Sequence, residues 1–182
     1  MRSLLSLALL FTLAACNQNG TGSATNNVNL IKIGCAVPLT GPLSHMGQDV
    51  QAGINIALEQ ANTQNIVLDG KPAQFELRCE DDQGEPHLAT QAAQRLVDTH
   101  VAAVISNLTS GTTIPASKIY ADAGIPQITP ASTNPEFTKQ GYHTAFRIIP
   151  DDTLQGRVLA SFAVNHLHRS RIAIIDDRTA YG

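Results

Sequence analysis

Two short polar segments place hydroxyl side chains where a predicted strand gives way to a helix. Ser110 lies in the segment Leu-Thr-Ser-Gly-Thr-Thr, and Thr133 lies in the segment Pro-Ala-Ser-Thr-Asn-Pro. Hydroxyls beside the free N–H groups of a helix N-terminus form a site for an anion such as a carboxylate. Gly111 would let that ligand approach the backbone closely. The alternative for both hydroxyls is helix capping alone, because Ser and Thr commonly cap helices.

A third polar segment, 177–182, has the same position after a predicted strand and contains Tyr181. Ligands of parallel α/β proteins bind outside the carboxyl ends of the strands, so the three segments are candidates for one site. Taken alone, Tyr181 is more often a half-buried packing residue. Asp81 and Asp82 are adjacent in a predicted strand and should point to opposite faces, so we expect no metal site there.

The elements that must position these segments alternate between strands and helices from residue 30 onward. Continuous apolar runs indicate buried parallel strands, and apolar residues at helical spacing indicate helices that cover them. This alternation predicts an α/β fold, a parallel sheet with helices on both faces. The expected strands are 30–37, 73–81, 101–107, 125–129, 145–149 and 171–176; the expected helices are 47–62, one beginning at Pro86, 112–123, a short one after Pro135, and 153–168.

A break at Pro150-Asp151-Asp152 interrupts this pattern, and the helix 153–168 and the strand 171–176 begin again after it. The sequence ends at Gly182, just past a predicted strand with no later partner to cover its edge. We therefore expect a C-terminally truncated fragment.

The N-terminal segment Met-Arg-Ser-Leu-Leu-Ser-Leu-Ala-Leu-Leu-Phe-Thr-Leu-Ala-Ala-Cys is typical of a secretory signal, and its apolar stretch is too short to span a bilayer. Its end resembles the lipobox of bacterial lipoproteins. The resemblance implies a signal peptide over 1–15 and a membrane lipid attached to Cys16; the alternative is an ordinary signal with a chance cysteine. The Asn-, Gly-, Ser- and Thr-rich residues 16–29 then form a flexible tether.

Composition narrows the classes of function. The chain has 182 residues, 43% of them hydrophobic, and a formal net charge of -3 with no basic run. Nucleic-acid binders need clustered Lys and Arg, so nucleic acid is not an expected partner. Export permits a disulfide between Cys35 and Cys79. We favour two separate buried thiols, because bridges across adjacent strands fit disulfide geometry poorly.

Short motifs across nearly all of 31–182 match those of one known family, in the same order and at the same spacing. They include Ile31-Lys32-Ile33, Thr40-Gly41-Pro42, Asp81-Asp82, Ser110, Pro115-Ala116-Ser117, Pro130-Ala131, Thr133-Asn134-Pro135, Phe146-Arg147, Gln155-Gly156 and Tyr181-Gly182. On these motifs the chain resembles the branched-chain amino acid substrate-binding proteins of ABC importers, a family with the periplasmic-binding-protein-like (type I) fold.

The resemblance implies an incomplete N-terminal ligand-binding lobe over 30–150 and the start of a second, similar lobe over 151–182. It also implies roles for particular residues. Ser110 and Thr133 match hydroxyls that hold the ligand's α-carboxylate, and the carbonyl of Ala131 matches an acceptor for its α-ammonium group. Tyr181 matches an aromatic contributed by the second lobe. The same wall includes Leu108 and Thr109. Met46 stands where family members often carry an aromatic over the side-chain pocket, and Gly84 and Thr109 replace a cysteine pair found in some members.

The implied function is that of a non-enzymatic receptor, exported and lipid-anchored on the extracytoplasmic face of a bacterial membrane. It would bind leucine, isoleucine, valine or a similar small amino acid by hinge closure and deliver it to an ABC permease, without a cofactor or metal. One alternative is a ligand sensor or a regulatory lipoprotein of cell-wall synthesis with the same fold. A hydrolase with Ser110 as nucleophile is a weaker alternative, because no general base can be named.

Overall fold

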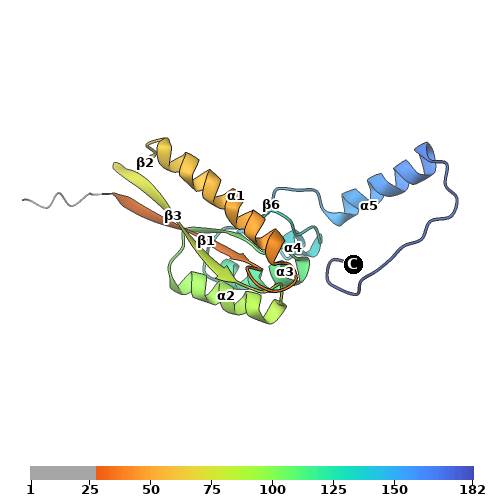
Figure 1. The fold of residues 1–182 in the computed structure, drawn as a ribbon, viewed down its shortest axis with the longest axis horizontal. Helices are drawn as coiled ribbons and strands as arrows, with labels where there is room; N and C mark the ends of the chain where they lie inside the picture. The colour runs from red at the N-terminus through yellow and green to blue at the C-terminus, as the bar shows by residue number, and fades with distance from the viewer. Residues whose placement is uncertain (1–27) are drawn as a thin grey trace, which may run out of the picture.

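A computed structural model describes residues 28–182 of the chain. Strands and helices alternate along it, as the sequence predicts (Figure 1). In chain order they are β1 (Asn29–Val37), α1 (Ser44–Thr63), β2 (Val67–Leu68), β3 (Lys71–Asp81), α2 (Pro86–Asp98), β4 (Ala103–Ser106), α3 (Ser110–Asp122), β5 (Gln127–Thr129), α4 (Glu136–Lys139), β6 (Ala145–Arg147), α5 (Asp152–Ser161) and a π-helix, η1 (Phe162–His166).

The strands form one sheet in the order β2-β3-β1-β4-β5-β6. All pairings from β3 to β6 are parallel, which confirms the expected sheet. The exception is β2, a two-residue strand antiparallel to β3 that the sequence did not predict. Asp69 and Gly70 form its turn with φ of 52° and 75°, the left-handed values that two-residue hairpins require.

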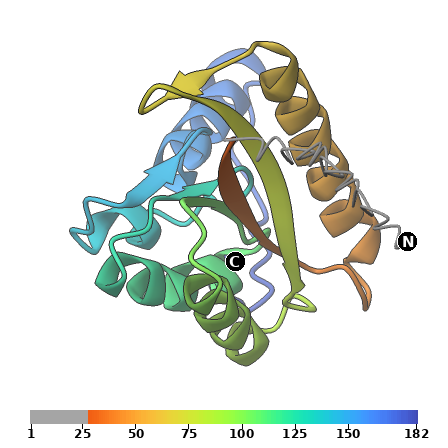
Figure 2. The same cartoon turned by 90° about the vertical axis from the view of Figure 1, so that its left-hand side faces the viewer.

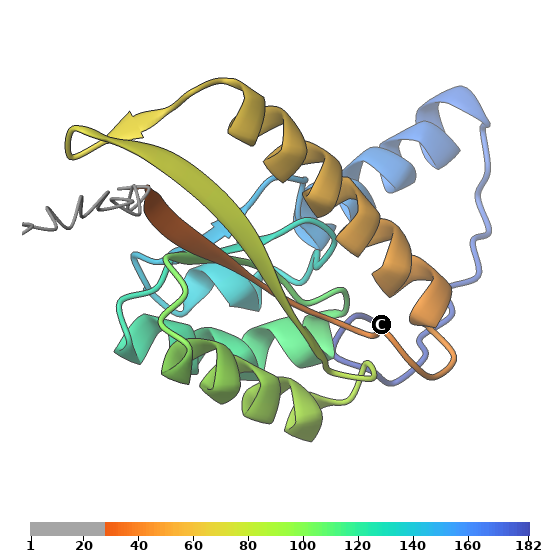
Figure 3. The ribbon, with the colours of Figure 1, turned by 60° about the vertical axis from the view of Figure 1, so that its left-hand side comes forward.

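Helices cover both faces of this sheet, with α1 on one face and α2 and α3 on the other (Figures 2 and 3). Alternation along β1 explains this arrangement, since successive side chains point to opposite faces. Ala36 lies in the core with α2 and α3, whereas its neighbours Cys35 and Val37 lie in the core under α1. The two faces of the sheet therefore carry separate apolar cores, one with α1 and one with α2 and α3.

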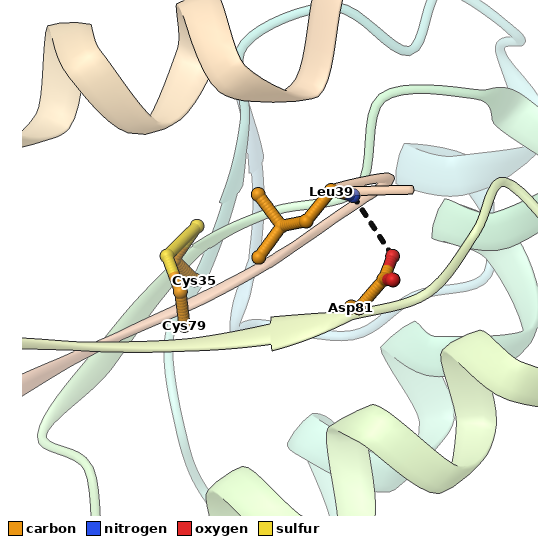
Figure 4. The surroundings of a disulfide bond; sticks show 4 residues. All are labelled: Cys35, Leu39, Cys79 and Asp81. Atoms are coloured by element: carbon orange, nitrogen blue, oxygen red, sulfur yellow. Dashed lines mark hydrogen bonds between the residues drawn. A yellow bond between two sulfur atoms is a disulfide. The ribbon is translucent and has the colours of Figure 1, made fainter. Parts of the chain in front are cut away.

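A disulfide joins Cys35 to Cys79, and our expectation of two separate thiols was wrong (Figure 4). The reason is register. The two cysteines are directly paired in the parallel strands β1 and β3, with Cα atoms 4.3 Å apart and both side chains in the core under α1. Two cysteines that are directly paired on the same face of a sheet can form a disulfide. A shift of one residue in the strand register would point one of them to the opposite face.

The segment after β6 stands apart from the sheet. The predicted helix 153–168 is present as α5 followed by η1, which project away from the other elements (Figure 1). The predicted strand 171–176 is wrong, because residues 171–177 have neither helix nor strand. Ile174 and Ile175 are 92% and 93% exposed, so no described strand lies beside this segment to pair with it. The chain then returns toward the N-terminal end of α3, where Asn134 donates a hydrogen bond to the Ala180 carbonyl.

Candidate functional site

A cleft of about 950 Å³ lies at the carboxyl ends of β4 and β5, where the sequence predicts a ligand site. All seven residues expected to contact a ligand line this one cleft. They come from four separate parts of the chain and are Met46, Leu108, Thr109, Ser110, Ala131, Thr133 and Tyr181.

Ser110 is the first residue of α3 and is only 1% exposed. The alternative that it caps this helix is wrong, since the cap is Thr109, whose side chain accepts a hydrogen bond from the Thr112 N–H. The Ser110 hydroxyl oxygen instead accepts hydrogen bonds from the Ser132 hydroxyl at 3.2 Å and the Asn134 N–H at 3.3 Å. Ser110 therefore ties α3 to the loop after β5.

Thr133 carries the most informative atom of the cleft. Its hydroxyl oxygen is buried and has no hydrogen-bond partner among the described residues. It does not cap α4, whose N-cap residue is Pro135 with no side-chain hydrogen bond. A buried hydroxyl without a partner costs free energy, because it has lost its hydrogen bonds to water. Such an atom at the wall of a cleft is placed to bind a polar group of a ligand.

The rest of the cleft wall divides by polarity. Leu108 is nearly buried, whereas Met46 and Tyr181 are 44% and 56% exposed. Together with Leu43 and Pro86 they give the cleft apolar surface besides its hydroxyls. A small molecule with a polar end and an aliphatic end matches this combination.

Asp81 fixes the loop that brings Leu43 and Met46 to the cleft. Its carboxylate accepts a hydrogen bond from the Leu39 N–H at 2.8 Å (Figure 4). It accepts another from the Thr40 hydroxyl at 2.5 Å. Burial alone would raise the pKa of Asp81, but hydrogen bonds from Thr40, Gln83 and Leu39 outweigh it and hold the pKa below 3.8. The ionised carboxylate therefore stabilises this loop.

Five further polar residues of the cleft were not predicted as contacts. Ser132 belongs to the polar run that pointed to Thr133, so its position was visible in the sequence but its orientation was not. Gln155 is part of the family resemblance, Asp177 and Thr179 belong to the polar segment 177–182, and no signal marked Glu85. These residues are Glu85, Ser132, Gln155, Asp177 and Thr179.

Residues 28–182 contain neither a cluster of metal ligands nor a helix that could span a membrane. No group of three or more His, Cys, Asp or Glu side chains has the arrangement of metal ligands. Asp81 and Asp82 bind separate partners, Thr40 and Asn107. Among the helices of this part of the chain, none is both long and apolar enough to cross a membrane.

A parallel sheet with a cleft at its carboxyl edge is the architecture of a ligand-binding lobe. Residues 30–182 match the family described as periplasmic binding protein. The chain belongs to this family. It is 34% identical over 152 residues to Leu/Ile/Val-binding protein homolog 1 of Brucella abortus, which covers 84% of this chain and 40% of that protein.

A second relative is the leucine-, isoleucine-, valine-, threonine- and alanine-binding protein of Pseudomonas aeruginosa. It is 36% identical over 163 residues, which are 90% of this chain and 43% of that protein. The chain thus spans about two fifths of the length of these curated relatives.

Solved structures show the same fold. The substrate-binding protein LivJ of Streptococcus pneumoniae, in complex with isoleucine, matches with a TM-score of 0.69 and 30% identity over 77% of this chain and 39% of that one. The leucine-binding protein LivK of Thermotoga maritima matches with a TM-score of 0.67 and 34% identity over 76% of this chain and 38% of that one. The predicted fold and family are confirmed.

Proposed function

We propose that the chain acts as an extracytoplasmic solute-binding lipoprotein of an ABC importer and not as an enzyme. Its ligands would be branched-chain or related small aliphatic amino acids. The relatives' names describe binding of such amino acids, and the cleft pairs hydroxyls with an aliphatic wall. The Thr133 hydroxyl, which is buried and has no hydrogen-bond partner within residues 28–182, is the observation that carries this proposal, because a ligand would supply the missing hydrogen bond.

In this proposal the α-carboxylate binds at the N-terminus of α3. Thr133 and Ser110 present hydroxyls there, and the helix terminus adds N–H groups and a partial positive charge. The Ala131 carbonyl accepts from the α-ammonium group. The aliphatic side chain then lies toward Leu108, Thr109 and Met46. All of these residues lie within 30–150, so they form the wall that the first lobe contributes.

Ligand capture would occur by closure of two lobes, with residues 30–150 in the first and 151–182 in the second. Gln155 and Tyr181 belong to the second lobe and line the cleft from that side. A contact made only in the closed form gives the ligand a higher affinity for that form, which is the condition for closure. Tyr181 is 56% exposed, so it has surface left to cover a ligand.

We further propose export and attachment to membrane lipid through Cys16, followed by a tether to residue 29. The signal peptide, Cys16 and most of the tether lie outside the described residues. The disulfide between Cys35 and Cys79 supports export, since disulfides persist in oxidising compartments. Mass spectrometry of the chain produced in a bacterium should find a diacylglycerol-modified N-terminal Cys16. An unmodified Cys16 would contradict the lipid anchor.

The ligand assignment is tested by nuclear magnetic resonance titration of the ¹⁵N-labelled chain. Because Met46 and Tyr181 leave the apolar part of the cleft largely exposed, we expect L-leucine to bind with a dissociation constant on the order of millimolar. Its addition should shift the amide signals of Ser110, Ala131 and Thr133. L-leucinamide, which lacks the carboxylate, is the matched ligand and should shift them much less. Equal shifts with both ligands would contradict the carboxylate site.

A further inference from the structure

A buried hydrogen-bond network lies directly beneath the cleft. Asp82, Asn107 and Thr129 are each 0% exposed and stand at the carboxyl ends of β3, β4 and β5. In the sheet, β1 separates β3 from β4. The N–H of Asp82 donates to the Val37 carbonyl at 3.2 Å, and the N–H of Asn107 donates to the Ala36 carbonyl at 2.8 Å. The Asp82 and Asn107 side chains therefore meet across the end of β1.

Asn107 is the centre of this network. Its φ of 56° is left-handed, a conformation that Asn adopts more readily than most residues. Its side-chain Nδ2 donates to the Asp82 carboxylate at 2.8 Å, and its Oδ1 accepts from Gln127 Nε2 at 3.2 Å. Its backbone carbonyl accepts from the Thr129 hydroxyl at 3.2 Å. One residue thus connects three strand ends.

Thr129 extends this hydrogen-bond network to the loop at the cleft. Its hydroxyl oxygen accepts hydrogen bonds from the N–H of Ser132 at 3.0 Å and the N–H of Ala131 at 3.4 Å. The Ser132 hydroxyl in turn donates to Ser110. Hydrogen bonds thus connect the Asn107 carbonyl, through the Thr129 hydroxyl, to the loop that carries Ala131 and Thr133.

We propose that the Asp82–Asn107 pair is a positioning device that fixes the loop 130–133, and so aims the ligand-binding groups of Ala131 and Thr133. The consequence for binding rests on the proposed function, but the positioning itself is testable without any ligand. Keeping a buried carboxylate at this position costs free energy. Burial raises the pKa of Asp82, and the hydrogen bonds from Gly84 and Asn107 offset this rise only in part.

A swap of the two residues tests the pairing. Asn107→Asp alone sets two carboxylates against each other and removes the donor. The double variant Asp82→Asn/Asn107→Asp restores one donor and one acceptor, and still offers oxygens to the Gly84 N–H and to Gln127. Both Asn and Asp tolerate the left-handed backbone at residue 107.

Amide hydrogen exchange of Ala131 and Ser132 in the ligand-free chain is the readout. Asn107→Asp should accelerate it by about tenfold relative to the amides of the core under α1, and the swap should return it close to the wild-type rate. The matched control is Asn62→Asp, which removes a hydrogen bond to the Phe75 carbonyl at the other end of the sheet and should leave these two amides unchanged.

Unchanged exchange in Asn107→Asp, or no recovery in the swap, would overturn the proposal. If Asn107→Asp does not fold, Thr129→Val takes its place, because it removes the hydroxyl between Asn107 and the loop. Fast exchange of Ala131 and Ser132 in that variant supports the positioning role, and wild-type exchange overturns it. A chain that keeps this behaviour but fails to bind leucine would contradict the proposed function alone.

Discussion

The backbone N–H of Asp152 donates a hydrogen bond to the carbonyl of Thr133, with a distance of 2.9 Å between nitrogen and oxygen. Asp152 is the first residue of α5, and Thr133 carries the unpartnered hydroxyl of the cleft. The helix that stands apart from the sheet is thus attached to the backbone of the residue most directly implicated in binding. We therefore expect a change in the direction of α5 to move the backbone of Thr133 at the cleft wall.

Asp152→Pro should loosen this attachment without breaking α5. Proline fits the first turn of a helix, and the extended backbone of Asp151 suits a residue before proline. The substitution removes only the N–H that donates to Thr133. Residual dipolar couplings should then shrink in α5 relative to α1, while Asp152→Ala, which keeps the N–H, should behave as wild type. Couplings of α5 unchanged in Asp152→Pro would contradict the attachment.

Thr133→Val should leave the chain as stable as the wild type or stabilise it by up to about 1 kcal/mol, because it removes a buried hydroxyl without a partner. The same substitution at Thr113 should destabilise the chain by about 1 kcal/mol, since that hydroxyl donates to the Thr109 carbonyl at 2.7 Å. Urea denaturation measures both. A Thr133→Val variant that is as destabilised as Thr113→Val would mean that the Thr133 hydroxyl is already bonded.

Asp81→Asn should destabilise the chain by roughly 1 kcal/mol at pH 7, because the Thr40 hydroxyl and nearby N–H groups lose a charged acceptor. The folded pKa lies below 3.8, so this stabilisation is present above pH 3.8 and is lost as the pH falls through the folded value. Stability measured against pH should therefore fall less steeply in the variant below pH 3.8. Asp69→Asn, in the exposed β2–β3 turn, is the control, and an equal effect there would contradict the role of Asp81.

Loss of the disulfide should cost about 4 kcal/mol, the loop-closure estimate for a sequence separation of 44 residues. The double variant Cys35→Ala/Cys79→Ala should therefore unfold at a lower urea concentration than the oxidised chain. A reducing agent should destabilise the wild type and leave the variant unchanged. A wild type that is indifferent to the reducing agent would contradict the pairing of the two cysteines.

Much of the fold and of the cleft wall could be predicted from the sequence. The apolar runs mark the parallel strands, and the carboxyl ends of parallel strands share one edge of the sheet, so Ser110 and Thr133 had to lie near each other. The family resemblance added Ala131, Leu108 and Met46, and all of them line the cleft. These are features that local pattern and topology determine together.

Features that depend on register or on tertiary contacts could not be predicted. The pairing of Cys35 with Cys79 depends on the residue-by-residue register of β1 and β3, which the apolar pattern does not reveal. The bond between Asp82 and Asn107 joins residues on strands that are not neighbours. The apolar pattern of 171–176 indicated a strand, but a strand also needs a neighbour, and no described strand lies beside it.

The most direct test of the binding site is the leucine titration of the ¹⁵N-labelled chain repeated with Ser110→Ala. Ser117→Ala is the matched control, since Ser117 is equally buried in the same helix but bonds to the Ile114 carbonyl away from the cleft. We expect leucine to shift the Ala131 and Thr133 amides in the wild type and in Ser117→Ala, and to bind at least about tenfold more weakly to Ser110→Ala. Shifts that are absent from these residues in the wild type, or that are unchanged in Ser110→Ala, would contradict the amino-acid site.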